Sequence, residues 1–252
     1  MSAGDRRALR QRVGAALEER IAPLAPARRQ RFALARARLE RYAGDRRLRV
    51  LDAGCGDGLL ALALAERHPD WQLVGVDNRQ ELLDYARRRA ATRRVENLSF
   101  ERAELTEPLG RERFDAALAI ECLAEIPDDA RAVEVLAASL APGGLLLLQV
   151  PDRDWRPVLP GSPARWRDEV RHGYSPQEVI NLLRAAGLAA IELSHSFRGT
   201  VAVAQELRDR LKASHLALQA AVFPAMCAAV ALERRGVTWG PPRALLATGR
   251  RL

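Results

Sequence analysis

The chain has 252 residues, of which 48% are hydrophobic, 5% aromatic and 29% charged, with a formal net charge of +8 at pH 7. This composition excludes a disordered chain and fits one globular enzyme with a full core. Three cysteines form no Cys-x-x-Cys pair and leave an odd count, so we expect neither a disulfide nor a metal site. No stretch has the pattern of a secretory signal, and we therefore expect a cytoplasmic location.

The positive charge gathers in residues 1–49, which carry fourteen arginines against five acidic residues. Residues 6–21 and 26–42 place apolar side chains at helical spacing, which predicts two helices with arginine on their other faces. One interpretation is a solvated helical cap, residues 1–48. The other is a surface for an acidic partner: a phosphorylated or carboxylated substrate, an acyl carrier protein, an anionic lipid surface or nucleic acid. Nucleic acid is the least favoured, because aromatic residues that stack on bases are almost absent there.

Residues 50–58 read VLDAGCGDG, an apolar strand that runs into a glycine-rich turn, and a helix is predicted directly after it at 59–67. The glycines let the backbone turn sharply and pass close to a ligand. Leu59 stands where a dinucleotide-binding turn has its third glycine, so the pattern argues against a pyrophosphate cofactor. Asp57 is expected to cap the helix that follows.

A second buried strand is predicted at residues 72–77, and it ends in Asp77, 19 residues past Gly58. A carboxylate at the tip of such a strand can accept both hydroxyl groups of a ribose. The alternative is a Rossmann-like domain whose glycines serve only the packing of helix on strand, and that alternative leaves Asp77 unexplained.

The glycine turn, helix, strand and terminal acid together resemble the class I S-adenosylmethionine-dependent methyltransferases. The resemblance implies a Rossmann-like α/β fold whose seven-stranded sheet binds S-adenosylmethionine and releases S-adenosylhomocysteine. It also implies that Asp52 braces the turn near the methionine part of the cofactor, and that Glu104 stands where the family has an acid for the adenine amino group. The cofactor-binding residues expected from it are Asp52, Gly54, Cys55, Gly56, Gly58, Asp77, Asn78, Glu104, Leu105 and Ile120.

From residue 49 onward strands and helices alternate, which predicts a parallel sheet covered by helices on both faces. The cofactor-binding core is expected at 49–194, and the last strand of the sheet, which is antiparallel, at 244–252. The remaining expected elements are helices at 80–91, 128–140 and 175–187 and strands at 98–103, 114–121, 143–150 and 189–194.

Residues 195–243 form an insertion relative to the simplest family members, and two helices are expected in it, at 201–212 and 215–234. The apolar run in the second helix is too short to span a membrane, and Gln219 and Pro224 interrupt it. We expect this insertion to form a lid or a dimer contact, and a peripheral contact with a membrane stays open.

The resemblance implies direct displacement at the methyl carbon of a sulfonium, in which the protein mainly aligns donor and acceptor and excludes water. A hydroxyl acceptor that must lose its proton needs a base, and the candidate bases are His172, His195, Tyr174 and Glu125. For either histidine the alternative is a structural role. Residues 120–123 read IECL and lack the Asn/Asp-Pro-Pro-aromatic sequence of enzymes that methylate the amino groups of nucleobases.

We therefore expect a methyltransferase that acts on a small or carrier-tethered molecule, with an oxygen on an apolar or aromatic metabolite as the acceptor atom. Two alternatives stay open. One is an RNA or protein methyltransferase that docks its substrate through the arginine-rich N-terminus, and the other is a non-catalytic module that binds S-adenosylmethionine.

Overall fold

The computed structural model describes residues 25–162, 170–211 and 216–252. The first predicted helix, at 6–21, lies outside the described residues. The elements in chain order are α2 (Pro26–Ala43), β1 (Arg49–Ala53), α3 (Leu59–Arg67), β2 (Gln72–Asp77), α4 (Gln80–Arg93), β3 (Leu98–Arg102), β4 (Phe114–Ile120), η2 (Leu123–Glu125), α5 (Asp129–Ser139), β5 (Leu140–Pro151), α6 (Pro176–Ala185), β6 (Leu188–Phe197), α7 (Gly199–Leu211), α8 (Leu216–Arg234) and β7 (Ala244–Arg251).

The strands form one seven-stranded sheet in the order β3-β2-β1-β4-β5-β7-β6. The pairs from β3 to β5 are parallel, while β7 runs antiparallel to both β5 and β6. This arrangement confirms the predicted α/β fold with an antiparallel last strand. β1 and β4 are neighbours, but the chain continues from β1 to β2 on one side and from β4 to β5 on the other. Open α/β sheets bind ligands at such a switch point, in the crevice beside the carboxyl ends of the two strands.

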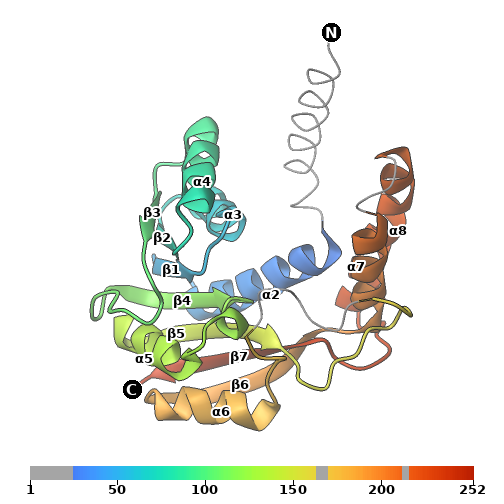
Figure 1. Cartoon of the computed structure of the whole chain (residues 1–252). Coiled ribbons are helices and arrows are strands. Elements are labelled where there is room, and N and C mark those ends of the chain that lie inside the picture. Colours follow the sequence, from blue (N-terminus) through green and yellow to red (C-terminus); the bar gives the residue numbers. More distant parts are fainter. Residues whose placement is uncertain (1–24, 163–169, 212–215) are drawn as a thin grey trace.

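Helices cover both faces of the sheet, as Figure 1 shows. Alternate residues of β1 divide between two apolar cores: Val50 packs with α2 and α3, and Leu51 packs with α5 and α6. A smaller cluster places α3 and α4 against Phe100 of β3. Burial on both faces explains why the central strands read as continuous apolar runs rather than as alternating ones.

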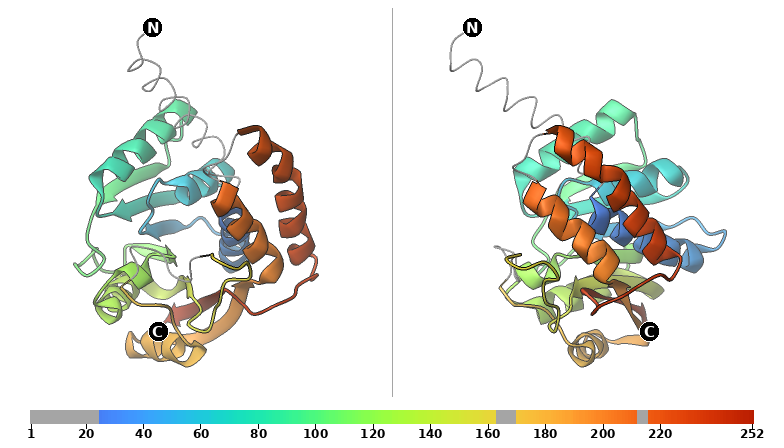
Figure 2. Two further views of the ribbon diagram at one scale, coloured as in Figure 1. Left: turned by 45° about the vertical axis from the view of Figure 1, so that its right-hand side comes forward. Right: turned by 90° about the vertical axis from the view of Figure 1, so that its right-hand side faces the viewer.

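The helix α2 is part of this layered structure, since Leu39 and Ala43 are buried against the sheet. Its first turn reaches the carboxyl edge of the sheet, where Ala27 packs with Phe197 at the end of β6 and with Val201 and Val230 of the insertion. The two insertion helices, α7 and α8, lie side by side next to α2 (Figure 2). The helix α2 and the insertion therefore meet at the carboxyl edge of the sheet.

The predicted element boundaries agree with the structure to within three residues, and β1, α3 and β2 need little or no adjustment. A capping box begins α6, with Ser175 and Glu178 each bonded to the other's backbone. The prediction that Asp57 caps α3 is wrong, because Gly58 occupies the N-cap and no side chain caps this helix. No helix in the described ranges is long and apolar enough to cross a membrane.

Candidate functional site

The glycine turn between β1 and α3 fits tightly against its surroundings. Gly54 has a φ of 66°, and a Cβ atom placed on it would lie 2.5 Å from the Cβ atom of Cys122. Gly56 has a φ of 54° but open space where its Cβ would stand. Gly54 is therefore required by packing and conformation, whereas the empty side of Gly56 leaves its backbone open to a ligand.

Asp77 lies directly across from this turn at the tip of β2. Its Oδ2 atom accepts a hydrogen bond of 2.8 Å from the Gly56 backbone N–H. Its Oδ1 atom accepts from the backbone N–H and from Nε of Arg79, both at 3.0 Å, and Nη2 of Arg79 lies 3.3 Å from Oδ2. Burial raises the pKa of this carboxyl, but the hydrogen bonds from Arg79 and Gly56 outweigh burial and hold the pKa below its ordinary value. Asp77 is thus a carboxylate at neutral pH.

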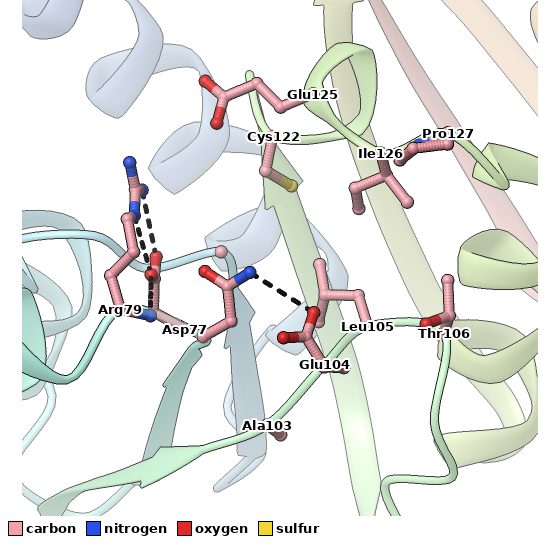
Figure 3. Close-up of a pocket in the computed structure, with 12 residues that line it drawn as sticks. Asp77, Arg79, Ala103, Glu104, Leu105, Thr106, Cys122, Glu125, Ile126 and Pro127 are labelled. Atoms are coloured by element: carbon pink, nitrogen blue, oxygen red, sulfur yellow. Dashed lines mark hydrogen bonds and ion pairs between the residues drawn. The ribbon is translucent and has the colours of Figure 1, made fainter. Parts of the chain in front are cut away.

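A pocket of about 500 Å³ opens beside Asp77. Its size lies within the range of small-molecule and cofactor sites. Figure 3 shows Asp77 and Arg79 on one side, Glu104 below, and Cys122 with Glu125 above. The lining residues are Gly54, Asp77, Asn78, Arg79, Ala103, Glu104, Leu105, Thr106, Cys122, Glu125, Ile126 and Pro127.

The wall of the pocket that follows β3 carries the residues that the family resemblance predicts for adenine. Asn78 donates a hydrogen bond of 3.3 Å from Nδ2 to Oε2 of Glu104 (Figure 3). Leu105, the next residue, is buried and gives this wall an apolar surface. A carboxylate beside an apolar side chain suits a flat ring with an exocyclic amino group.

Asp52 lies beneath the glycine turn rather than in the pocket. It is only 3% exposed, and burial raises the pKa of its carboxyl to about 7, against the opposing effect of a hydrogen bond from the Ala61 backbone. Its Oδ2 atom has no hydrogen-bond partner within the described part of the chain. Asp52 does not line the pocket, and its hydrogen bond from Ala61 ties β1 to α3, the two elements that the glycine turn joins.

Four further residues expected at the cofactor do not line the pocket: Cys55, Gly56, Gly58 and Ile120. The side chain of Cys55 is buried, and burial raises the pKa of its thiol. The Cys55 backbone N–H donates to the Val76 carbonyl, so it holds the turn against β2. Cys55, Gly56 and Gly58 shape the turn that brings the Gly56 backbone to Asp77, whereas Ile120 ends β4.

The four candidate bases are not brought together. Glu125, on η2, is exposed and lines the pocket. His172 is half-buried and outside the lining, and His195 lies on the edge strand β6 with Nε2 3.9 Å from Oδ2 of Asp152. Only Glu125 of these three stands at the pocket.

Tyr174 does not fit the predicted role of a base. Its side chain is fully buried, and its hydroxyl donates a hydrogen bond of 2.9 Å to Oδ2 of Asp129. Burial and this hydrogen bond raise the pKa of Tyr174, so the phenol stays protonated. Its role is structural.

Two arginine side chains with no role predicted from the sequence lie at the edge of the site. Arg28 of α2 pairs with Asp57 in the glycine turn at 3.0 Å, and Arg31, one turn further, pairs with Glu121 at 3.3 Å. Arg79 was also missed, although its position two residues after Asp77 was a usable signal. The basic character of α2 is thus directed in part at carboxylates of its own chain.

Comparison with known proteins identifies the family. The family model for a methyltransferase domain matches residues 27–193, from the first turn of α2 into β6. The chain belongs to the class I S-adenosylmethionine-dependent methyltransferases.

Curated relatives are similar in sequence to part of this chain. Trans-aconitate 2-methyltransferase of Acidovorax ebreus (strain TPSY) is 31% identical over 165 residues, which cover 62% of each chain. A ubiquinone biosynthesis O-methyltransferase of Coxiella burnetii (strain RSA 493 / Nine Mile phase I) is 34% identical over 112 residues, which cover 44% of this chain and 46% of the relative. The chain thus spans less than two thirds of the length of these relatives.

Solved structures share the fold of this chain. The [4+2]-cyclase SpnF superposes with a TM-score of 0.65 at 24% identity, covering 87% of this chain and 81% of SpnF. Phosphoethanolamine N-methyltransferase 2 of Haemonchus contortus, in complex with S-adenosyl-L-methionine, gives a TM-score of 0.64 at 17% identity, covering 85% of this chain and 51% of that one. At these identities the likeness shows the fold alone.

Proposed function

We propose that this protein transfers a methyl group from S-adenosylmethionine to an oxygen atom of a small molecule. The observation that carries the proposal is the Asp77 carboxylate, ionised and bonded to the glycine turn, at the mouth of a pocket of about 500 Å³. The residues fit the cofactor: a carboxylate for the ribose hydroxyls, a turn without side-chain bulk, and Glu104 with Leu105 for the adenine ring.

The cofactor, when bound, supplies a methyl group on a positively charged sulfur that leaves as a neutral thioether. The chain has to hold the acceptor oxygen in line with that methyl group and keep water away. If the acceptor is a hydroxyl, its proton would have to leave to a base of the chain as the oxygen takes the methyl group. Glu125 is the carboxylate we propose for that proton, because it lines the pocket beside Cys122. His172 and His195 are less well placed, since neither lines the pocket.

A small acceptor is supported by what surrounds the carboxyl edge. The helices α2, α7 and α8 stand together there, and α2 donates Arg28 and Arg31 to carboxylates of its own chain. Such paired arginines have less charge to offer an RNA backbone or an acidic protein. The names of the relatives, a trans-aconitate 2-methyltransferase and a ubiquinone biosynthesis O-methyltransferase, also point to small acceptors.

A second candidate function is chemistry other than methyl transfer on the same fold. Its support is the similarity to SpnF, which is a [4+2]-cyclase. A fold alone does not decide the reaction. Incubation with S-adenosylmethionine that is labelled in the methyl group separates the two: a methyltransferase moves the label into an extractable small molecule, and a cyclase leaves it on the cofactor.

Replacement of Asp77 tests the cofactor site. Asp77→Ala should abolish detectable binding of S-adenosylhomocysteine in calorimetry while the thermal transition stays cooperative. The matched control is Asp70→Ala, which removes a half-exposed aspartate between α3 and β2, away from the pocket. Unchanged affinity in Asp77→Ala would refute the assignment of Asp77 to the ribose.

A further inference from the structure

One wall of the cofactor pocket is a short turn, residues 122–127, which we call the η2 wall. Four of its residues line the pocket: Cys122, Glu125, Ile126 and Pro127. Two backbone hydrogen bonds of 3.1 Å lie within it, from Glu125 to Cys122 and from Ile126 to Leu123. A 3₁₀ turn of three residues has poor hydrogen-bond geometry, so the position of this wall depends on contacts with other parts of the chain.

A distant segment of the chain, just before α6, contacts the centre of the η2 wall. The backbone N–H groups of Val170 and Arg171 both donate to the carbonyl of Ala124, at 2.9 and 3.4 Å. Ala124 is the middle residue of η2 and is 2% exposed. A buried carbonyl requires a hydrogen-bond partner, and residues 170 and 171 supply two. The wall is therefore held at its centre by the backbone of this segment.

The side chain of Arg171 fixes this segment to two helices. Its Nη1 atom donates to Oδ2 of Asp129 at 2.6 Å, and its Nη2 atom donates to Oε1 of Glu178 at 3.0 Å. The guanidinium also lies 4.0 Å from the centroid of the Tyr174 ring. Asp129 is the first residue of α5, and Glu178 lies in the first turn of α6. Arg171 thus joins the starts of both helices next to the point where its own backbone contacts η2.

Loss of the Arg171 guanidinium would affect Asp129 more than Glu178. Glu178 is also bonded to the guanidinium of Arg153 and to the N-cap backbone N–H of α6, and both bonds would stay. Asp129 would keep the hydroxyl of Tyr174, but its side chain is only 15% exposed, so water could replace the guanidinium only in part. A partly buried carboxylate that loses its cation is destabilised. Asp129 follows the end of the η2 wall closely, so its displacement would reach the wall.

The η2 wall is also in contact with the glycine turn. Sγ of Cys122 donates to the carbonyl of Ala53 at 3.4 Å, and the next residue, Gly54, has no room for a Cβ atom beside Cys122. Figure 3 shows Cys122 and Glu125 above the pocket, with Glu104 below it. A displacement of η2 would therefore change both the width of the pocket and the packing of the glycine turn.

We propose that Arg171 is a positioning residue for the cofactor pocket. It holds the η2 wall in place at two points: its backbone, with that of Val170, bonds to Ala124, and its guanidinium bonds to Asp129. Arg171 does not line the pocket, so its effect on the cofactor passes through the wall. This inference rests on the proposed function in that S-adenosylmethionine occupies this pocket.

The test measures binding of S-adenosylhomocysteine by calorimetry and hydrogen–deuterium exchange at residues 122–127, with the full chain and well below the lowest thermal midpoint of the set. Arg171→Met removes both charged bonds but keeps an apolar stem over the Tyr174 ring. Arg171→Lys restores a cation that can reach Asp129 but lacks the fork of the guanidinium. Arg153→Met is the matched control, because it also removes a bond to Glu178 but leaves the pair of Arg171 with Asp129 intact.

Arg171→Met is expected to bind S-adenosylhomocysteine about tenfold more weakly than the wild type and to exchange faster at residues 122–127. Arg171→Lys should recover part of the affinity, and Arg153→Met should stay within about twofold of the wild type. An affinity of Arg171→Met within about twofold of the wild type, even with a lowered thermal midpoint, would show a purely structural role and overturn the proposal. An equal loss in Arg153→Met, or no recovery in Arg171→Lys, would overturn it too. If the wild type itself binds no S-adenosylhomocysteine, the proposed function fails instead.

Discussion

Removal of the Arg79 side chain should tighten cofactor binding. The Asp77 carboxylate has room for about four hydrogen bonds, and it accepts four: one from Gly56, one from the Arg79 backbone and two from the Arg79 guanidinium. A ribose that uses both carboxylate oxygens must displace the two guanidinium bonds (Figure 3). Binding therefore includes the cost of opening this ion pair.

The size of the effect follows from the exposure of Arg79. Its side chain is 50% exposed, so the pair belongs with solvent-screened ion pairs worth about 0.5–1 kcal/mol. Arg79→Ala should accordingly bind S-adenosylhomocysteine about two- to fivefold more tightly in calorimetry. The difference in affinity between Arg79→Ala and the wild type should become smaller in 1 M salt, because salt screens the Arg79–Asp77 ion pair of the wild type.

The matched control is Arg87→Ala, which removes a similarly exposed arginine that pairs with Asp84 on α4 outside the pocket. Its affinity for S-adenosylhomocysteine should equal that of the wild type. Weaker binding by Arg79→Ala, beyond a factor of two, would show that the guanidinium assists the cofactor directly and would refute the reasoning.

Three further predictions concern residues around the site. Burial raises the pKa of Asp52 to about 7, against an ordinary value near 3.9, so the free energy of unfolding falls as pH rises between these values. Asp52→Asn should remove this fall, so that in urea unfolding the variant gains on the order of 2 kcal/mol over the wild type between pH 5 and pH 8. A gain that is the same at every pH would contradict the raised pKa. Gly54→Ala should cost at least about 2 kcal/mol from the contact with Cys122 and the positive φ, and Cys122→Gly in the same chain should restore part of this in thermal melts. Tyr174→Phe should lower stability by about 1–3 kcal/mol through loss of the hydrogen bond to Asp129, with kcat unchanged; a tenfold loss of kcat in a folded variant would restore Tyr174 as the base.

The parts of the fold that could be predicted are those set by local sequence. The glycine turn, α3 and β2 follow from glycine positions and apolar runs of fixed length, and these signals act within a few residues. The strand β6 extends three residues past its predicted end because Phe197 packs against α2 and the insertion, a contact between distant segments. Distant packing has no local signature in the sequence.

Some residues of the site could likewise be predicted from the sequence, and others could not. Asp77, Asn78, Glu104 and Leu105 were expected at the cofactor from the family resemblance, which matches them at or just beyond the ends of predicted strands, and the structure places all four around one pocket. Arg79 could have been found from its position two residues after Asp77, whereas the role of Arg31 could not, since the direction of a long side chain depends on which carboxylate is within reach in the folded chain.

The position of α2 connects the two halves of the site. Arg28 and Arg31 are three residues apart and so lie on one face of the helix; the first pairs with Asp57 of the glycine turn and the second with Glu121, which directly follows β4. The same end of α2 is tied to α7, because the Ala27 backbone N–H donates to Gln205. A shift of this helix would therefore alter the glycine turn and the surroundings of Glu121 together. Such a shared support gives Arg28 and Arg31 a role within the site that needs no external acidic partner.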